Sequence, residues 1–240
     1  MRRGKRLAGT RINEPQPRRS TGGWSPFEPA VMAVHDFARP TVKPTASFAE
    51  VLETRRSGLG GAVAWPRIAD LLWFAAGVRG YHPVGRAGIP IQWSATPSAG
   101  GLGCVRVVCL ADDGSRPRLY DPFEHRLLEL DIEAELVAAA NRETVKAVVG
   151  KAAGCTLRLI ADEVKLSAAY SDAESLMFRD AGALVATLAL CAVWLGMTAC
   201  PLGFLGDDLV PKLGFPADRF RGVGAVQIGR VVHGIGHPTD

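Results

Sequence analysis

A stretch of twenty residues without a charged side chain, AGALVATLALCAVWLGMTAC at positions 181–200, restricts this chain more than any other feature. A stretch of that length either crosses a bilayer, which takes about 20 apolar residues, or forms a long helix buried inside a protein. Arg179 and Asp180 stand directly before it, and no positive cluster follows it. We therefore predict a long central helix over residues 176–197. A chain anchored in the membrane through residues 181–200 is the alternative, which solubility without detergent would exclude.

The remaining pattern predicts one domain that mixes helices and strands. Ser47 and Glu50 have capping-box spacing, and Pro66 stands in the first turn of a second helix. A third helix is expected over residues 133–149. Strands are expected at 104–110, 118–122, 125–130, 156–161 and 225–228, and residues 165–175 and 200–204 are expected to be irregular. His125 is expected on the surface of the hairpin.

The positive charge is concentrated at the N-terminus. The net charge is +4, but residues 1–20 alone hold seven arginine and lysine residues against one acid, Glu14. Residues 1–45 contain several prolines and show no periodicity, so we expect an extended arm there and a folded domain over residues 46–240. No apolar stretch of the kind found in a secretory signal peptide follows the N-terminal charges, so we do not expect such a signal. Nucleic-acid binding is disfavoured, because it usually requires basic residues spread over a folded face.

The five cysteines, Cys104, Cys109, Cys155, Cys191 and Cys200, lie in apolar surroundings and form no C-x-x-C pair. Free buried thiols in the reducing cytoplasm fit this pattern best, and a zinc site is disfavoured.

Two short stretches have the chemistry of a binding site. Residues 96–103 contain a Pro-Ser start and three glycines before a strand, so main-chain N–H groups and the Ser98 hydroxyl can approach a flat or anionic ligand closely. Arg55, Arg56 and Ser57 end the first helix, where guanidinium groups and a hydroxyl suit phosphate oxygens. Each stretch has a structural alternative, a tight turn before a strand and a solvated helix end.

Taken together and in this order, five segments resemble the nitroreductase-like flavoproteins, and within them the SagB-type (thiazole/oxazole) dehydrogenases that modify ribosomal peptides. The resemblance spans residues 48–230. Its segments are Arg55-Arg56-Ser57, Pro97-Ser98-Ala99-Gly100, Tyr120-Asp121-Pro122 with His125 and Leu127, Arg179-Asp180-Ala181-Gly182, and residues 195–203, LGMTACPLG.

The resemblance implies an α+β nitroreductase-like fold, with an antiparallel core sheet flanked by helices and a long buried central helix. It also implies FMN held at a homodimer interface and oxidoreductase chemistry in natural product biosynthesis, on a small-molecule or peptide substrate, in the cytoplasm, without membrane or nucleic acid. A partner protein of a modification complex is a further expectation. The implied FMN-binding residues are Arg55, Arg56, Ser57, Pro97, Ser98, Ala99, Gly100, Pro201, Leu202, Gly203 and Arg230, and Tyr170 is the implied catalytic acid or base.

Three positions depart from that family's pattern. Leu59 stands where the family has a second basic residue, Gly103 stands in the place of a tyrosine-proline segment, and Ala169 precedes Tyr170 where the SagB branch has lysine. These departures motivate the alternative, a degenerate subunit of the same fold that binds flavin weakly or not at all and serves as a scaffold or binding partner.

Overall fold

The computed structural model describes residues 13–19 and 23–232. Its main sheet has seven antiparallel strands in the order β10-β11-β8-β5-β6-β7-β2. The strands are β2 (Val31–Asp36), β5 (Val105–Ala111), β6 (Arg118–Asp121), β7 (Arg126–Leu130), β8 (Cys155–Asp162), β10 (Met197–Leu202) and β11 (Phe220–Arg230). Two small sheets pair β1 (Gln16–Pro17) with β9 (Tyr170–Ser171), and β3 (Gly80–His82) with β4 (Ile91–Trp93).

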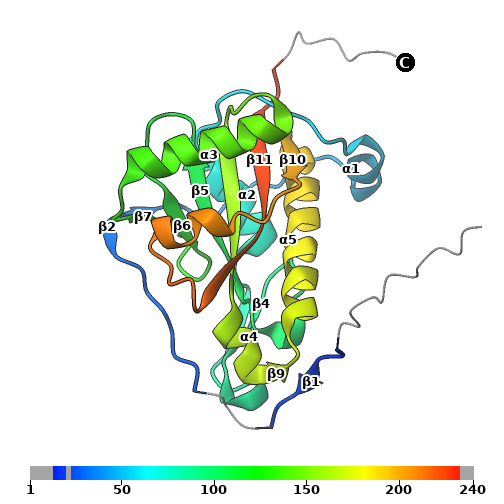
Figure 1. Cartoon of the computed structure of the whole chain (residues 1–240). Coiled ribbons are helices and arrows are strands. Elements are labelled where there is room, and N and C mark those ends of the chain that lie inside the picture. Colours follow the sequence, from blue (N-terminus) through cyan, green and yellow to red (C-terminus); the bar gives the residue numbers. More distant parts are fainter. Residues whose placement is uncertain (1–12, 20–22, 233–240) are drawn as a thin grey trace, which may run out of the picture.

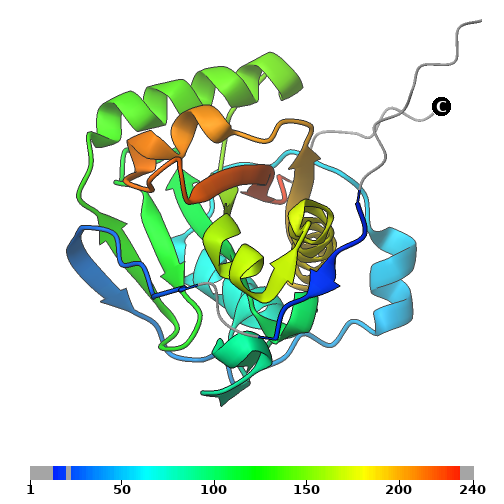
Figure 2. The same ribbon diagram turned by 60° about the horizontal axis from the view of Figure 1, so that its bottom comes forward.

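Helices cover both faces of the main sheet (Figures 1 and 2). On one face lie α2 (Trp65–Ala76) and α5 (Glu174–Trp194), which share a core with the inner strands. On the other face lie α3 (Ala134–Val149) and the 3₁₀ turns η3 (Asp207–Leu209) and η4 (Pro211–Leu213). β8 runs between these layers and is buried along its whole length, as a central strand requires. The α+β fold with an antiparallel core sheet is therefore confirmed.

The predicted long helix is α5, and it packs against α2, β10 and β11. By length and composition alone it could cross a membrane, yet its Asp180 is buried and hydrogen-bonded inside the fold. Only part of its surface is covered by the rest of the chain. Phe178, Gly182 and Ala186, spaced four residues apart, leave one apolar stripe of α5 exposed.

The predicted helix starts are confirmed. Ser47 caps α1 (Phe48–Thr54), and its hydroxyl accepts from the Glu50 N–H while the Glu50 carboxylate accepts from the Ser47 N–H. Pro66 lies in the first turn of α2. The η1 turn (Arg86–Gly88) joins β3 to β4.

Three expectations about local structure are wrong. Residues 165–175 are not irregular, because the Asp162 carboxylate caps a helix, α4 (Glu163–Ala169), by accepting from the Lys165 N–H. Residues 200–204 do not form a turn only, because β10 continues to Leu202 and its proline is tolerated on an edge strand. His125 is fully buried, with its ring 5.1 Å from that of Trp73.

The N-terminal segment is extended where it is described, but part of it belongs to the sheet. β2 pairs with β7 from Val31 to Asp36 and forms one edge. Residues 24–30, which we call the strap, begin beside the end of β8 in space and lead along the chain into β2. The strap is tied to the domain at both ends, by the Trp24 indole N–H on Asp162 (3.1 Å) and by the Asp131 N–H on the Ala30 carbonyl (3.0 Å).

Candidate functional site

The glycine-rich stretch folds into a tight turn, η2 (Ala99–Gly101), immediately before β5. Gly100, Gly101 and Gly103 all have positive φ, which glycine adopts without steric cost. The Ser98 hydroxyl accepts from the Gly103 N–H (3.1 Å) and so closes the turn from inside. Pro97 and Gly100 are exposed at its tip. The turn is thus a rigid loop with an open edge.

Asp180 fastens this turn to the second helical turn of α5. Both of its carboxylate oxygens accept from the Ala99 N–H, at 2.9 and 3.1 Å, and the Cys104 thiol donates to one of them at 3.5 Å. Burial raises the pKa of Asp180, an effect that the hydrogen bond from Ala99 partly offsets. Burial likewise raises the pKa of the Cys104 thiol. From the sequence, Asp180 was recognised only as part of the segment 179–182, and its anchoring role was not predicted.

Tyr170 stands over the same turn. It follows α4 as the first residue of β9, and its hydroxyl oxygen lies 2.7 Å from where a Cβ atom on Gly100 would stand. The guanidinium carbon of Arg86 lies 5.5 Å from the centre of the Tyr170 ring. Tyr170 and the Pro97–Gly100 segment therefore meet.

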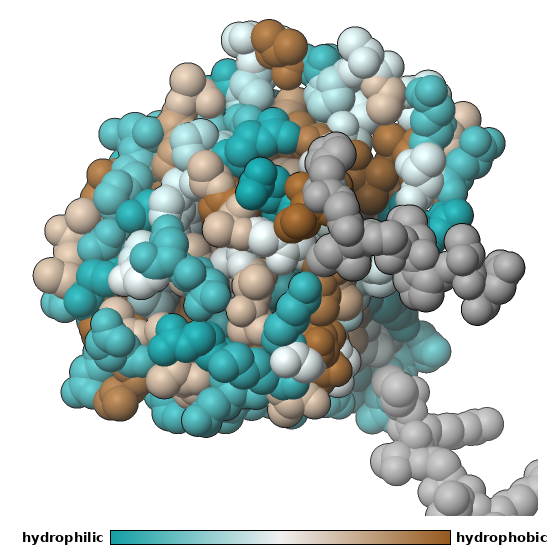
Figure 3. All heavy atoms as spheres, turned by 90° about the horizontal axis from the view of Figure 1, so that it is seen from above, coloured by the Kyte–Doolittle hydropathy of each residue, from teal (hydrophilic) through white to brown (hydrophobic). Residues whose placement is uncertain are grey.

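The other predicted residues gather at the opposite end of α5. Ser57 forms a parallel bridge with Ala199 of β10, and Gly61 pairs with Arg230 at the end of β11. The segment 55–61 therefore runs along the outer edge of the sheet, with Arg55 and Arg230 at the same end of the molecule. That end presents hydrophilic and hydrophobic side chains side by side (Figure 3).

The arginines at this end have no acidic partner within the described part of the chain. Among the residues that the structure describes, no carboxylate lies within 4.0 Å of Arg55, Arg56 or Arg230. Arg56 donates back to the carbonyls of Glu53 (2.8 Å) and Arg55 (3.1 Å), so it is folded against its own helix end. Arg55, Ser57 and Arg230 are the better placed of the predicted phosphate contacts.

Pro201, Leu202 and Gly203 lie at the end of β10. Pro201 and Gly203 are exposed, whereas the Leu202 side chain is buried in a small cluster with Val145 and Ala225. Leu202 can therefore contribute only main-chain groups to a ligand.

The two groups of residues are separated within one chain. The Pro97–Gly100 turn is fixed at Asp180, near the start of α5, and Ser57 is fixed at Ala199, just beyond its end. The fifteen helical residues from Asp180 to Trp194 span roughly 20 Å. Figure 1 shows α4 and β9 beside one end of α5, and α1 beside the other. The predicted site residues thus form two separate groups, or candidate half-sites, which we call the turn half and the arginine half.

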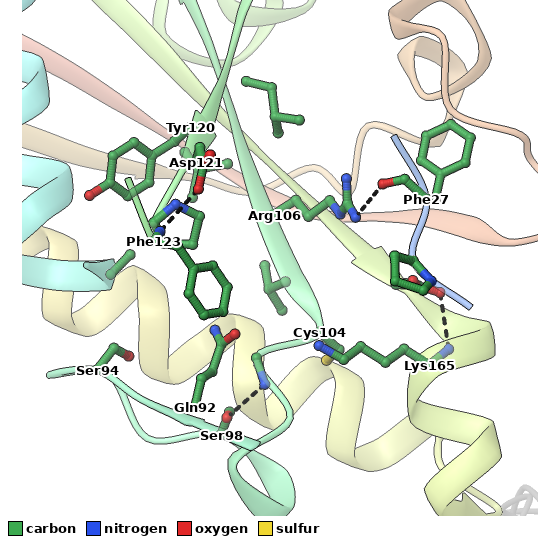
Figure 4. Close-up of a pocket in the computed structure, with 18 of the residues that line it drawn as sticks. Phe27, Gln92, Ser94, Ser98, Cys104, Arg106, Tyr120, Asp121, Phe123 and Lys165 are labelled. Carbon is green, nitrogen blue, oxygen red and sulfur yellow. Dashed lines mark hydrogen bonds between the residues drawn. The ribbon is translucent and has the colours of Figure 1, made fainter. Parts of the chain in front are cut away.

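A cavity of about 570 Å³, which was not predicted from the sequence, lies behind the turn half. Pro97, Ser98 and Gln92 line one side of it, and the strap lines another (Figure 4). The Lys165 side chain lies along the wall of the cavity and points toward Cys104 (Figure 4), and its ammonium group donates to the Leu102 carbonyl at 2.5 Å. Burial lowers the pKa of Lys165. No sequence signal marks this cavity, because its residues come from six separated segments.

Comparison with solved structures identifies the fold. A presumed nitroreductase from Ralstonia eutropha JMP134 superposes with a TM-score of 0.63 at 21% identity, covering 92% of this chain and 100% of that one. The Escherichia coli microcin synthetase McbBCD complex, with truncated pro-MccB17 bound, gives a TM-score of 0.54 at 16% identity over 82% of this chain and 77% of that one. A nitroreductase with bound FMN from Bacteroides fragilis NCTC 9343 gives 0.50 at 13% identity, covering 82% and 94%.

The chain therefore has the nitroreductase fold, as predicted. The sequence itself matches no protein-family model, and no curated protein matches it significantly. Identities near one residue in five establish the fold and leave the reaction to be argued from the site.

Proposed function

We propose that this chain is an FMN-dependent oxidoreductase that works as a homodimer. The observation that carries the proposal is the presence of both half-sites on a nitroreductase fold. The arginine half offers the cations and hydroxyl that an organic phosphate needs, in Arg55, Ser57 and Arg230. The turn half offers a rigid, glycine-lined edge for a flat ring, in Pro97, Ser98, Ala99 and Gly100. These residues fit FMN, and a structural neighbour with bound FMN supports the choice.

A second copy of the chain supplies the missing half of each site in this proposal. The exposed stripe of Phe178, Gly182 and Ala186 runs along α5 between the two halves. No atom lies within 4 Å of a Cβ placed on Gly182, so another helix can approach closely there. Two chains packed antiparallel along α5 would bring the turn half of each to the arginine half of the other. In this arrangement the exposed stripe of α5 is covered by a second copy of the chain.

When bound, FMN supplies the redox step, by taking up and returning two electrons at its ring. The protein residues bind, orient and handle protons. Arg55, Ser57 and Arg230 would hold the phosphate, and Asp180 keeps the turn rigid through Ala99. Exposed Pro201 and Gly203 would border the ring. Tyr170 would hold or release a proton at its hydroxyl oxygen, which already faces the turn.

The tailoring of a peptide or related natural product, in the cytoplasm, is the more specific role that we propose. Its supports are the SagB-type motifs of the sequence and the structural likeness to the microcin synthetase complex. Such a role would also give the chain a partner protein. It requires neither a membrane nor nucleic acid.

The absorbance spectrum of the purified protein tests the proposal. We expect a yellow protein that carries one FMN per chain. A colourless dimer that takes up no added FMN would favour the second candidate, a flavin-free scaffold subunit. Leu59 and the folded-back Arg56 are the observations in its favour. A Leu59→Lys variant that gains FMN affinity would then locate the defect in the arginine half.

A further inference from the structure

The cavity behind the turn half lies in an opening of the main sheet. β5 and β6 pair only at Val108–Leu119 and Cys109–Arg118, so the ladder between them ends there. Before Val108, β5 continues toward its start at Val105 beside β8 alone. Figure 4 shows the strands approaching one another away from the cavity and standing apart beside it. The opening is walled by apolar side chains, including Val105, Val107 and Leu128.

The strap closes the opening from the other side. Besides its ties at Trp24 and Ala30, the Ser25 carbonyl accepts from Arg219 (2.7 Å) and the Phe27 carbonyl accepts from Arg106 (2.8 Å). Four hydrogen bonds therefore hold seven residues across the cavity, and the space beneath them is built into the fold. A volume of about 570 Å³ lies within the range of small-molecule sites.

Both signs of charge line the cavity: Glu28, Asp121, Asp162 and Asp180 are acidic, and Arg106, Arg126 and Lys165 are basic. Asp162 is paired with Arg219 at 2.7 Å, and Asp121 with Arg126 at 2.9 Å. Asp180 is occupied by the Ala99 N–H. In the part of the chain that the structure describes, neither Lys165 nor Arg106 has a carboxylate within 4.0 Å.

Lys165 has donors to spare. Its ammonium group donates to the Leu102 carbonyl and lies 5.0 Å from the centre of the Trp24 ring. An ammonium group has three N–H donors, so further acceptors can bind it. A cation removed from water is stabilised best by an anion that also accepts its hydrogen bonds.

We propose that this cavity binds an apolar carboxylate, with the carboxylate at Lys165 and the hydrocarbon body in the opening between β5 and β6. Because Ser98 and Gln92 line the same cavity, the bound acid reaches the back of the turn half. The assignment of this acid as the substrate of the oxidoreductase rests on the proposed function. The binding of the acid in the cavity does not depend on that function.

Isothermal titration of the flavin-stripped protein tests the binding. The probes are naphthalene-2-carboxylate and naphthalene-2-carboxamide, which share a body and differ in charge. We expect the acid to bind and the amide to bind at least tenfold more weakly, since a charge-assisted hydrogen bond is lost. Equal binding of the two, or no binding of the acid at millimolar concentration, overturns the proposal, and this comparison needs no variant.

Two lysine variants then locate the site. Lys165→Met keeps the length of the side chain and removes its charge, and we expect it to weaken acid binding on the order of tenfold to a hundredfold. Lys146→Met, at an exposed position on α3, is the matched control and should bind as the wild type does. Undiminished acid binding by Lys165→Met contradicts the proposal.

Two further measurements follow. The first distinguishes a peptide from a small metabolite as the bound acid, and the second distinguishes failure of the cavity proposal from failure of the oxidoreductase proposal. The tripeptide Val-Val-Phe and its C-terminal amide distinguish a peptide terminus from a free acid: preference for the tripeptide acid over naphthalene-2-carboxylate supports a peptide, and the reverse a small metabolite. Flavin content is read separately from absorbance. Acid binding by a protein that takes up no FMN would leave this cavity assigned while removing the oxidoreductase proposal.

Discussion

The hydroxyl oxygen of Tyr170 lies 2.7 Å from where a Cβ atom on Gly100 would stand. Gly100 also has a φ of 59°, so glycine is required there for two separate reasons. The turn and the proposed catalytic tyrosine are therefore positioned together. A change in either one is expected to disturb the other.

Replacing Gly100 by alanine should separate these two reasons. Gly100→Ala introduces backbone strain of roughly 1 kcal/mol and also displaces the Tyr170 hydroxyl. Gly114→Ala is the matched control, because Gly114 has a φ of 80° and no atom within 4 Å of the added methyl group. Denaturant unfolding should show the larger loss for Gly100→Ala, together with weaker FMN binding that the control lacks. Equal losses would mean that Tyr170 moves aside freely.

Asp180 should contribute to stability in a way that depends on pH. Asp180→Ala leaves the Ala99 N–H without its acceptor and should lower the free energy of unfolding by about 1–3 kcal/mol, whereas Asp180→Asn keeps an acceptor oxygen and should lower it less. Burial raises the folded-state pKa of Asp180 above its ordinary value of 3.8. The stability of the wild type relative to Asp180→Asn should therefore be greatest below pH 3.8 and fall as the pH rises through the raised pKa. A difference that is constant with pH would show that the carboxyl group titrates normally in the fold.

His125 should give the opposite dependence. It is fully buried, and the Tyr120 hydroxyl lies 3.1 Å from its Nδ1, while its Nε2 has no partner among the described residues. Burial lowers its pKa below the ordinary 6.5. The neutral ring therefore contributes stability that is present above pH 6.5 and is lost as the pH falls through the lowered pKa.

Substitution of this pair checks that assignment. His125→Asn tolerates the positive φ of this position and should flatten the pH dependence of unfolding below pH 6.5. Tyr120→Phe removes only the hydrogen bond and should lower stability by about 0.5–1.5 kcal/mol at neutral pH. His82→Asn is a suitable control, since His82 is exposed at the end of β3. Identical pH profiles for the wild type and His125→Asn would contradict the burial argument.

The sequence predicted those parts of the fold whose signals are local. The capping box at Ser47, Pro66 at the start of α2 and the uncharged run of α5 each fix an element through neighbouring residues. The tight turn expected at the glycines before β5 is likewise local, since Gly100, Gly101 and Gly103 all have positive φ.

The features that were missed depend on distant segments. α4 begins because Asp162, at the end of a buried strand, turns back to cap it. β10 is a strand because β11 lies beside it, over the register from Met197–Arg230 to Leu202–Ala225. His125 is buried because Trp73 of α2 covers it. None of these partners can be read from the residues next to each element, and the same holds for the cavity beside Lys165.

The proposed division of the site between two chains predicts complementation between two inactive variants. Arg55→Glu damages the arginine half and Pro97→Trp obstructs the turn half, and both positions lie at least partly at the surface. Each variant alone should form dimers with both sites damaged and should hold little FMN. Mixed dimers, isolated through a different tag on each chain, carry both changes in one site and neither in the other. They should therefore regain about one FMN per dimer, half of the wild-type content. If each site were contained within one chain, the mixed dimers would stay empty, because every chain would still carry its own damaged half.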